Sequence, residues 1–478
     1  MAALGWVTAH LETWFAKSWL VATLVAGLAA LGIAINDGMP WIFAIGAVAY
    51  LTTVALSRTL DREDRDIALG LFGCALACRL LIVLILTLVS TEYATGGLLS
   101  PDGTGYLSGS RALVRSGFEV GSPFAFFGTY DIGQYYVFAA LLKVFGSDFT
   151  VLAVFNAAVG ALAAPFAFAW ARLTIPKHAV LVGSIAALSP SLALLATTNL
   201  LKDPMVMLGT LVVALSVARA LRGETKGRQI WLWLALGAFA LAFLHTTRFY
   251  VAAYLELGLL VAVAIRLFLT RNRQQWRTRL LGLIGAILVA ELLAGALGWP
   301  NSPAMVSTQV HYVGETQAMQ PALEQDTGGN RGPGLATVID VARRMFGPYV
   351  WVAPATLDLK YLVLADFDLY TDTFIWYVIV PFLAVGVVIA LRSLLRKERT
   401  DATALGYLAI FVSVYLAQYL AINLSYRQRE DVLLLAFAFV PAGARWVLAR
   451  RPAQALYAGY WIVLAVVAAG HLIIRANG

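Results

Sequence analysis

Apolar runs about the length of a membrane-crossing helix recur along this 478-residue sequence. A helix needs about 20 mostly apolar residues to cross the hydrocarbon core of a bilayer. Only 13% of the residues are charged, whereas soluble domains carry about 25%. A soluble chain could not cover so much apolar surface, so the sequence predicts an all-α, polytopic transmembrane helical bundle of about thirteen spans. The predicted spans are 18–35, 39–56, 67–90, 149–171, 178–197, 204–220, 229–246, 249–267, 280–298, 372–391, 403–423, 431–448 and 454–473.

The positions of the basic residues predict how these spans are oriented. Clusters of Lys and Arg in short connecting segments face the cytoplasm. The clusters are Arg58–Arg65, Arg172–Lys177, Arg219–Arg228, Arg266–Arg279, Arg392–Arg399 and Arg445–Arg451. All of them face one side only if the short apolar stretch 132–146 does not cross. We therefore expect 132–146 to be a juxtamembrane helix on the outer surface, with the N-terminus in the cytoplasm and the C-terminus outside.

The basic residues of the predicted cytoplasmic segments also explain the net charge of +8. No stripe of basic and aromatic residues typical of a nucleic-acid binder is present, so we expect no nucleic-acid partner. The sequence is rich in Ala and Arg, which is typical of GC-rich bacteria and predicts a location in the bacterial inner membrane.

Two outer segments, 91–148 and 299–371, are too long to be simple connectors. They divide the chain into a transmembrane catalytic module at 1–298, an outer (periplasmic) segment at 299–371 and C-terminal transmembrane helices at 372–478. Because the predicted cytoplasmic loops are all short, any chemistry is expected on the periplasmic side. The sequence lacks the GxxxxGK[ST] signature of ATP binding, so an activated lipid-linked substrate would have to supply the energy of a reaction.

The first outer segment contains a carboxylate suited to proton transfer. Asp102 stands in a Pro-Asp-Gly sequence, a turn composition that exposes its side chain. Tyr106 follows, at the start of a predicted short amphipathic helix in the membrane interface. Asp102 could accept a proton from a sugar hydroxyl, or could hold a divalent cation beside a phosphate. The structural alternative is that Asp102 only forms a turn.

Two further outer turns carry charged residues that could bind phosphate. In the first turn, Lys202 and Asp203 precede Pro204, and Asp203 could equally cap the helix that follows. In the second turn, Arg248 could bind phosphate through two hydrogen bonds, or could serve as an ordinary interfacial anchor. His245, in the same turn, is more typical of a structural, hydrogen-bonded histidine.

A fourth turn, Tyr426–Asp431, places Arg427 and Arg429 on the predicted outer side. Arginines there run against the positive-inside bias, which favours an anion site over a surface charge network.

Three ionisable residues fall inside predicted spans, namely Arg79, Glu256 and Glu291. Intramembrane carboxylates are rare and suggest function. A buried pair between Arg79 and either glutamate is the structural alternative to a role in substrate binding.

Residues 67–250 resemble the GT-C glycosyltransferases, the group that includes the protein O-mannosyltransferases and the aminoarabinose transferases. The resemblance rests on Asp102 followed by Tyr106, on an apolar stretch that ends in Val144-Phe145-Gly146, and on the turn Lys202-Asp203-Pro204. The adjacent Asp-Glu pair of the family's loop is absent here, and Asp131 is a candidate for the second acid.

The resemblance implies an inverting transfer of a sugar from a polyprenyl-phosphate donor to a glycan or lipid acceptor. Asp102 would be the catalytic base, and Lys202, Arg248 or the pair Arg427 and Arg429 would neutralise the phosphate. Whether a divalent cation such as Mg²⁺ or Mn²⁺ takes part is left open. An exopolysaccharide or O-antigen polymerase that uses polyprenyl-diphosphate oligosaccharides is the alternative enzyme. A transporter is disfavoured because the sequence has no internal repeat.

Overall fold

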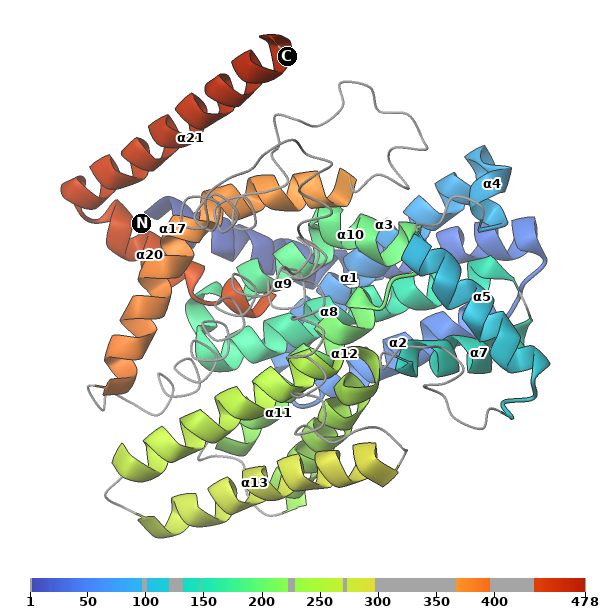
Figure 1. Ribbon diagram of the computed structural model, residues 1–478, viewed down its shortest axis with the longest axis horizontal. Helices are drawn as coiled ribbons and strands as arrows, with labels where there is room; N and C mark the ends of the chain where they lie inside the picture. Colours follow the sequence, from blue (N-terminus) through green and yellow to red (C-terminus); the bar gives the residue numbers. More distant parts are fainter. Residues whose placement is uncertain are drawn as a thin grey trace.

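The computed structural model describes residues 2–96, 101–119, 132–146, 148–221, 228–269, 273–296, 367–395 and 434–477. These residues form helices joined by turns, and no strand lies among them (Figure 1). The prediction of an all-α protein is therefore confirmed for this part of the chain. The helices are α1 (Ala2–Asp37), α2 (Ile42–Ser57), α3 (Arg62–Val89), α4 (Thr91–Ala94), α5 (Pro101–Arg115), α7 (Gly133–Phe145), α8 (Phe149–Thr174), η1 (Pro176–His178), α9 (Ala179–Leu188), α10 (Pro190–Thr198), α11 (Asp203–Leu221), α12 (Arg228–Leu269), α13 (Arg273–Ala296), α17 (Phe367–Leu395), α20 (Val440–Leu448) and α21 (Arg451–Asn477).

Among the described residues, seven helices are long and apolar enough to cross a membrane. The number is eight if the bent pair α9–α10 counts as one span. The protein is thus an all-α, multi-pass membrane protein, whereas thirteen spans and their orientation stay predictions. The predicted span 403–423 lies outside the described residues. In the predicted span 431–448, the described part is not one continuous helix, because a turn at 437–439 precedes the nine-residue α20.

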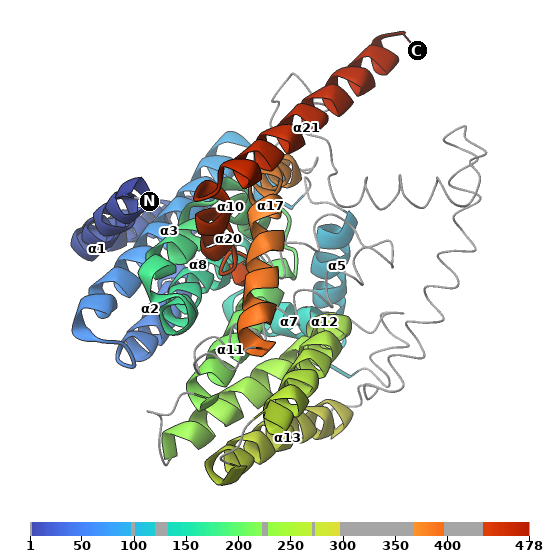
Figure 2. The same ribbon diagram turned by 90° about the vertical axis from the view of Figure 1, so that its left-hand side faces the viewer.

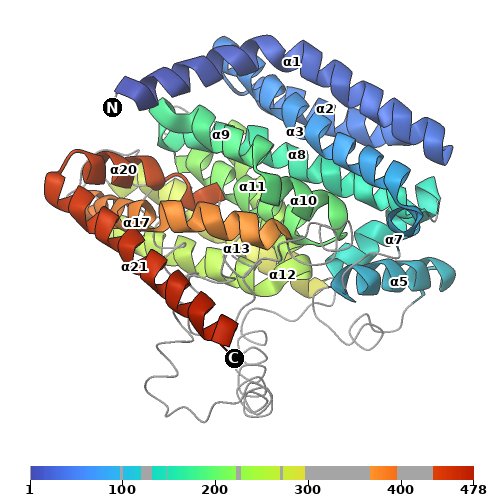
Figure 3. The same ribbon diagram turned by 90° about the horizontal axis from the view of Figure 1, so that it is seen from above.

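Apolar side chains fill the interior of this bundle and also lie on its outer surface. Helix α8 is buried along almost its whole length and packs against α3, α9 and α11 (Figure 3). Helices α1 and α21 expose large apolar side chains, including Leu20, Ile35, Leu456 and Ile462. An outward apolar surface of this kind is stable when lipid surrounds it, as the composition predicts.

Helices α5 and α7 lie side by side at one end of the bundle (Figures 1 and 3). Helix α7 has 13 residues and is therefore about 20 Å long, which is too short to cross a bilayer core of about 30 Å. A helix that does not cross was expected for 132–146, and its placement on the membrane surface stays a prediction. Helix α5 begins at Pro101, so Asp102 lies in its first turn and not in the predicted Pro-Asp-Gly turn. Proline and an acidic residue both suit the start of a helix.

Helices α17 and α20 approach each other through two glycines. A methyl group added to Gly386 would overlap the carbonyl oxygen of Phe439, and one added to Gly443 would overlap the carbonyl oxygen of Phe382. Small residues allow this backbone contact, which stabilises helix packing in lipid.

Replacing Gly443 with alanine is therefore expected to force α17 and α20 apart and to lower the free energy of unfolding by about 1–3 kcal/mol. The matched control is Gly459→Ala on α21, where no atom lies within 4 Å of the added methyl group. SDS-induced unfolding in mixed micelles measures both variants. An equal effect of the two substitutions would contradict the close-packing explanation.

The prediction that Arg79 pairs with Glu256 or Glu291 is wrong. Arg79 is fully buried, and its guanidinium donates to the carbonyl oxygens of Ala75, Ala186 and Ala187. The last two residues stand just before the break between α9 and α10, where the two helices meet at a bend of 40°. Pro190 begins α10 and has no N–H with which to bond the carbonyl of Ala186. Arg79 thus satisfies backbone carbonyls at a break inside the bundle, where lipid offers no donor.

Candidate functional site

Two buried amides hold the turn that joins α10 to α11. The Gln134 side chain of α7 donates from Nε2 to the carbonyl oxygen of Leu200 at 2.7 Å. The Asn156 side chain of α8 donates from Nδ2 to the carbonyl oxygen of Leu201 at 3.0 Å. Both amide side chains are fully buried. The turn is therefore fixed from two helices at once, which positions the two charged residues that follow it.

The backbone of this turn is strained. Leu200 has φ +50°, in the left-handed region that costs a residue with a Cβ about 1 kcal/mol or more. Such a conformation persists only where the surrounding contacts impose it, and Gln134 supplies one of these contacts. Tyr93 of α4 supplies another nearby, because its buried hydroxyl donates to the carbonyl oxygen of Thr197. Burial raises the pKa of the Tyr93 hydroxyl, so it stays protonated and able to donate.

Lys202 and Asp203 follow the strained turn and are both buried, with 7% and 1% of their surfaces exposed. Asp203 is the first residue of α11, and its Oδ1 lies 3.0 Å from Nη2 of Arg248. Arg248 is 1% exposed. The structure thus joins Asp203 and Arg248, predicted from two separate turns, in a buried ion pair. Lys202 adjoins Asp203 in the chain and is also buried, and these three residues are called the buried charged group. Asp203 contacts a guanidinium, and Arg248 lies inside the bundle and not at an exposed interface.

Arg248 also marks the place where α12 changes direction. Its backbone is extended (φ −158°, ψ 77°) between two helical segments. His245 and Glu256 stand on the two sides of this break, and His245 Nε2 lies 3.0 Å from Oε1 of Glu256. Eleven residues of straight helix would separate them by about 16 Å. The chain therefore folds back at Arg248, as the predicted turn between spans 229–246 and 249–267 requires.

A third ionisable group reaches the same place from α13. Oε1 of Glu291 lies 3.8 Å from His245 Nε2. Figure 2 shows α11, α12 and α13 grouped beside α7. The prediction of a hydrogen-bonded histidine is confirmed for His245, and its partner is Glu256, one of the two glutamates predicted to lie inside spans.

Asp102 and Tyr106 lie on α5. This helix packs against α7, and α7 in turn contacts α12, which carries His245 and Arg248. Asp102 is exposed, whereas Tyr106 is buried and its ring packs against Tyr135 of α7 with centroids 5.2 Å apart. The N-terminus of α7 in turn touches α12, since a methyl group on Gly133 would overlap Thr246. Asp131, Arg427 and Arg429 lie outside the described residues, as does almost all of 299–371.

Gln134, Asn156 and Tyr93 were not predicted as site residues. A sequence signal existed for Asn156, because it is a lone amide inside a long apolar run, and such residues usually bond another helix. Gln134 and Tyr93 stand in mixed outer segments, where nothing distinguishes them from ordinary polar residues.

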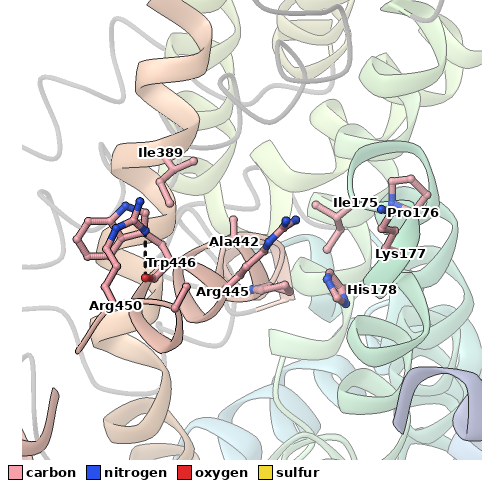
Figure 4. Close-up of a pocket in the computed structure, with 11 residues that line it drawn as sticks. Ile175, Pro176, Lys177, His178, Ile389, Ala442, Arg445, Trp446 and Arg450 are labelled. Carbon is pink, nitrogen blue, oxygen red and sulfur yellow. Dashed lines mark hydrogen bonds between the residues drawn. The ribbon is translucent and has the colours of Figure 1, made fainter. Parts of the chain in front are cut away.

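A separate hollow of about 600 Å³ lies near the N-terminus of α9, whereas the charged group follows the C-terminus of α10. Its basic lining residues are Lys177, His178, Arg445 and Arg450, and Figure 4 shows Arg445 on the α20 side and His178 on the opposite side. The guanidinium of Arg450 stacks over the ring of Trp446 at 4.4 Å. The hollow adjoins two of the basic clusters that the positive-inside rule predicts to face the cytoplasm. That rule accounts for its charge without a bound ligand.

Comparison with known proteins does not identify a family for this chain. No protein-family model matches the chain, and no curated protein matches its sequence.

Proposed function

We propose that this protein is a membrane glycosyltransferase that moves a sugar from a polyprenyl-phosphate donor to a glycan or lipid acceptor on the outer face of a bacterial inner membrane. The observation that carries the proposal is the exposed carboxylate of Asp102. Asp102 lies near the N-terminus of α5, and α5 packs on the short α7. Gln134 of α7 also bonds the connection between α10 and α11 that leads to Lys202 and Asp203. A base on a helix that is linked through α7 to a buried group containing Lys202 and Arg248 suits a substrate with a reacting hydroxyl and a phosphate.

The reaction that fits these residues is a single displacement. An acceptor hydroxyl attacks the anomeric carbon of the sugar as its bond to the phosphate oxygen breaks. Asp102 accepts the proton of the hydroxyl, and the polyprenyl phosphate leaves with the bonding electrons. Attack opposite the leaving group inverts the anomeric carbon.

The phosphate would be neutralised by Lys202 and Arg248. Arg248 already faces one anionic partner, the carboxylate of Asp203. A phosphate would therefore compete with Asp203 for the guanidinium, and its arrival would loosen the contact between α11 and the bend of α12. Arg427 and Arg429 are the other predicted partners of the phosphate.

The test is a transfer assay with purified full-length protein in nanodiscs, radiolabelled polyprenyl-phosphate sugars and extracts of cell lipids and glycans. We expect wild type to transfer label and Asp102→Asn to lose at least about 100-fold of the rate, the contribution of a general base. The matched control is Glu92→Gln, which removes another exposed carboxylate of the same outer segment and is expected to leave the rate unchanged.

Donor binding by Asp102→Asn, measured in the same nanodiscs, separates loss of the base from loss of the fold. Unchanged transfer by this variant would remove Asp102 from the mechanism. Chain growth from polyprenyl-diphosphate oligosaccharides, with no transfer from any monophosphate donor, would replace the proposal with the polymerase. Flux of an intact substrate across proteoliposomes without any new glycosidic bond would indicate a transporter.

A further inference from the structure

We propose that His245, Glu256 and Glu291 bind one divalent transition-metal ion. Their donor atoms all lie within 4.8 Å of one another. One imidazole and two carboxylates form a mixed nitrogen and oxygen donor set, which suits Zn²⁺, Fe²⁺ or Mn²⁺ better than Ca²⁺ or Mg²⁺. Metal content is measured without any substrate, so this proposal stands whether or not the protein transfers sugars.

The distances between the donor atoms are those of ligands that share an ion. His245 Nε2 lies 3.0 Å from Oε1 of Glu256 and 3.8 Å from Oε1 of Glu291. With metal–ligand bonds of about 2.1 Å, neighbouring ligands are about 3.4 Å apart in a tetrahedral site and about 3.0 Å apart in an octahedral one. The two distances from His245 Nε2 therefore differ from these values by a few tenths of an ångström, and all three donor atoms lie within 4.8 Å of one another.

The fold assembles this site from three helical segments. His245 precedes the bend of α12, Glu256 follows it, and Glu291 comes from α13. The extended backbone of Arg248 folds the chain back so that the first two ligands meet. A bound ion would tie both halves of α12 to α13, and its binding energy would add to the stability of their packing.

Burial distinguishes this site from a surface cluster of acidic residues. The side chains of His245, Glu256 and Glu291 are 1%, 6% and 20% exposed. Two carboxylates held this close in an apolar region cannot both stay charged unless a cation lies between them; otherwise one of them binds a proton. A divalent cation bound by two carboxylates and a neutral imidazole gives a net charge of zero.

The imidazole turns Nε2 toward the two carboxylates. His245 is fully buried, and Nε2 is the ring nitrogen that contacts Glu256 and Glu291. A metal on Nε2 would leave the ring proton on Nδ1, which has no hydrogen-bond partner among the described residues.

Metal analysis of the full-length protein tests the proposal. The protein is purified in detergent, loaded with Zn²⁺ or Mn²⁺, freed of loose metal by desalting and measured by mass spectrometry of the elements. We expect about one ion per chain in wild type and a loss of at least about 90% of it in Glu256→Gln and Glu291→Gln. Glu92→Gln, the control carboxylate of the outer segment, is expected to keep the ion.

A second measurement on wild type needs no variant. EDTA is expected to lower the melting temperature in detergent, and stoichiometric Zn²⁺ is expected to restore it, because an ion that binds only the folded state stabilises it. No retained metal together with an unchanged melting temperature would overturn the proposal, and a shared proton would then join the three side chains. Equal metal content in wild type and in both glutamine variants would also overturn it.

Discussion

Replacing Arg248 with methionine is expected to lower the free energy of unfolding by about 3–5 kcal/mol, the usual result of removing one partner from a buried ion pair. Asp203 and Arg248 have side chains that are each 1% exposed, and their charged atoms lie 3.0 Å apart. Without the guanidinium, the Asp203 carboxylate would lose the cation that faces it at this depth. SDS-induced unfolding in mixed micelles measures the loss.

The double variant Asp203→Asn/Arg248→Met separates this electrostatic explanation from simple loss of packing. We expect the double variant to recover most of the stability, because it leaves no charge of the pair behind. A matched comparison is Glu12→Gln, which removes the carboxylate 3.3 Å from Arg172 Nη1. The two side chains of that pair are 26% and 32% exposed, so water can replace the lost contact and the loss should be no more than about 1 kcal/mol. If the double variant is as unstable as Arg248→Met, packing and not charge holds the bend.

The helices could largely be predicted from the sequence, because a lipid-exposed or buried span must be a continuous apolar run. Helices α3, α8 and α11 begin and end within a few residues of the predicted spans. Interruptions within an apolar run were harder to predict. The predicted span 178–197 is divided into α9 and α10 at Pro190, a residue that hydropathy alone does not penalise enough to end a span.

The partners of the buried charged residues could not be predicted in the same way. The sequence predicts that Arg79, Glu256 and Glu291 lie in spans, but it does not indicate which side of each helix faces which neighbour. A rotation of one helix by one residue, about 100°, changes every partner. The sequence therefore suggested that Arg79 pairs with one of the glutamates. In the structure, Arg79 instead donates hydrogen bonds to backbone carbonyls, and the glutamates contact His245. Lys202, Asp203 and Arg248 were identified as charged turn residues, although their association depends on the bend of α12.

The second large effect is expected at the break between α9 and α10. Replacing Arg79 with leucine leaves the carbonyls of Ala186 and Ala187 without the donor that now serves them. Each unsatisfied buried carbonyl costs about 1–3 kcal/mol, so we expect a loss of about 2–6 kcal/mol in the free energy of unfolding. Removal of the buried charge offsets little of this loss. The cost of placing an arginine in the membrane is incurred when α3 inserts, before the helices pack together.

A second substitution distinguishes the loss of hydrogen bonds from the loss of side-chain volume. Pro190 is exposed, so Pro190→Ala should cost little packing. It supplies the backbone N–H that reaches the carbonyl of Ala186 once Ser189 changes from its extended to a helical conformation and α9 and α10 straighten. In the Arg79→Leu background, Pro190→Ala is therefore expected to restore about 1–3 kcal/mol, the cost of one unsatisfied carbonyl. In the wild-type background the same change should restore nothing, because Arg79 already donates to that oxygen. Identical effects of Pro190→Ala in the two backgrounds, measured by SDS-induced unfolding, would mean that Arg79 stabilises the break through packing alone.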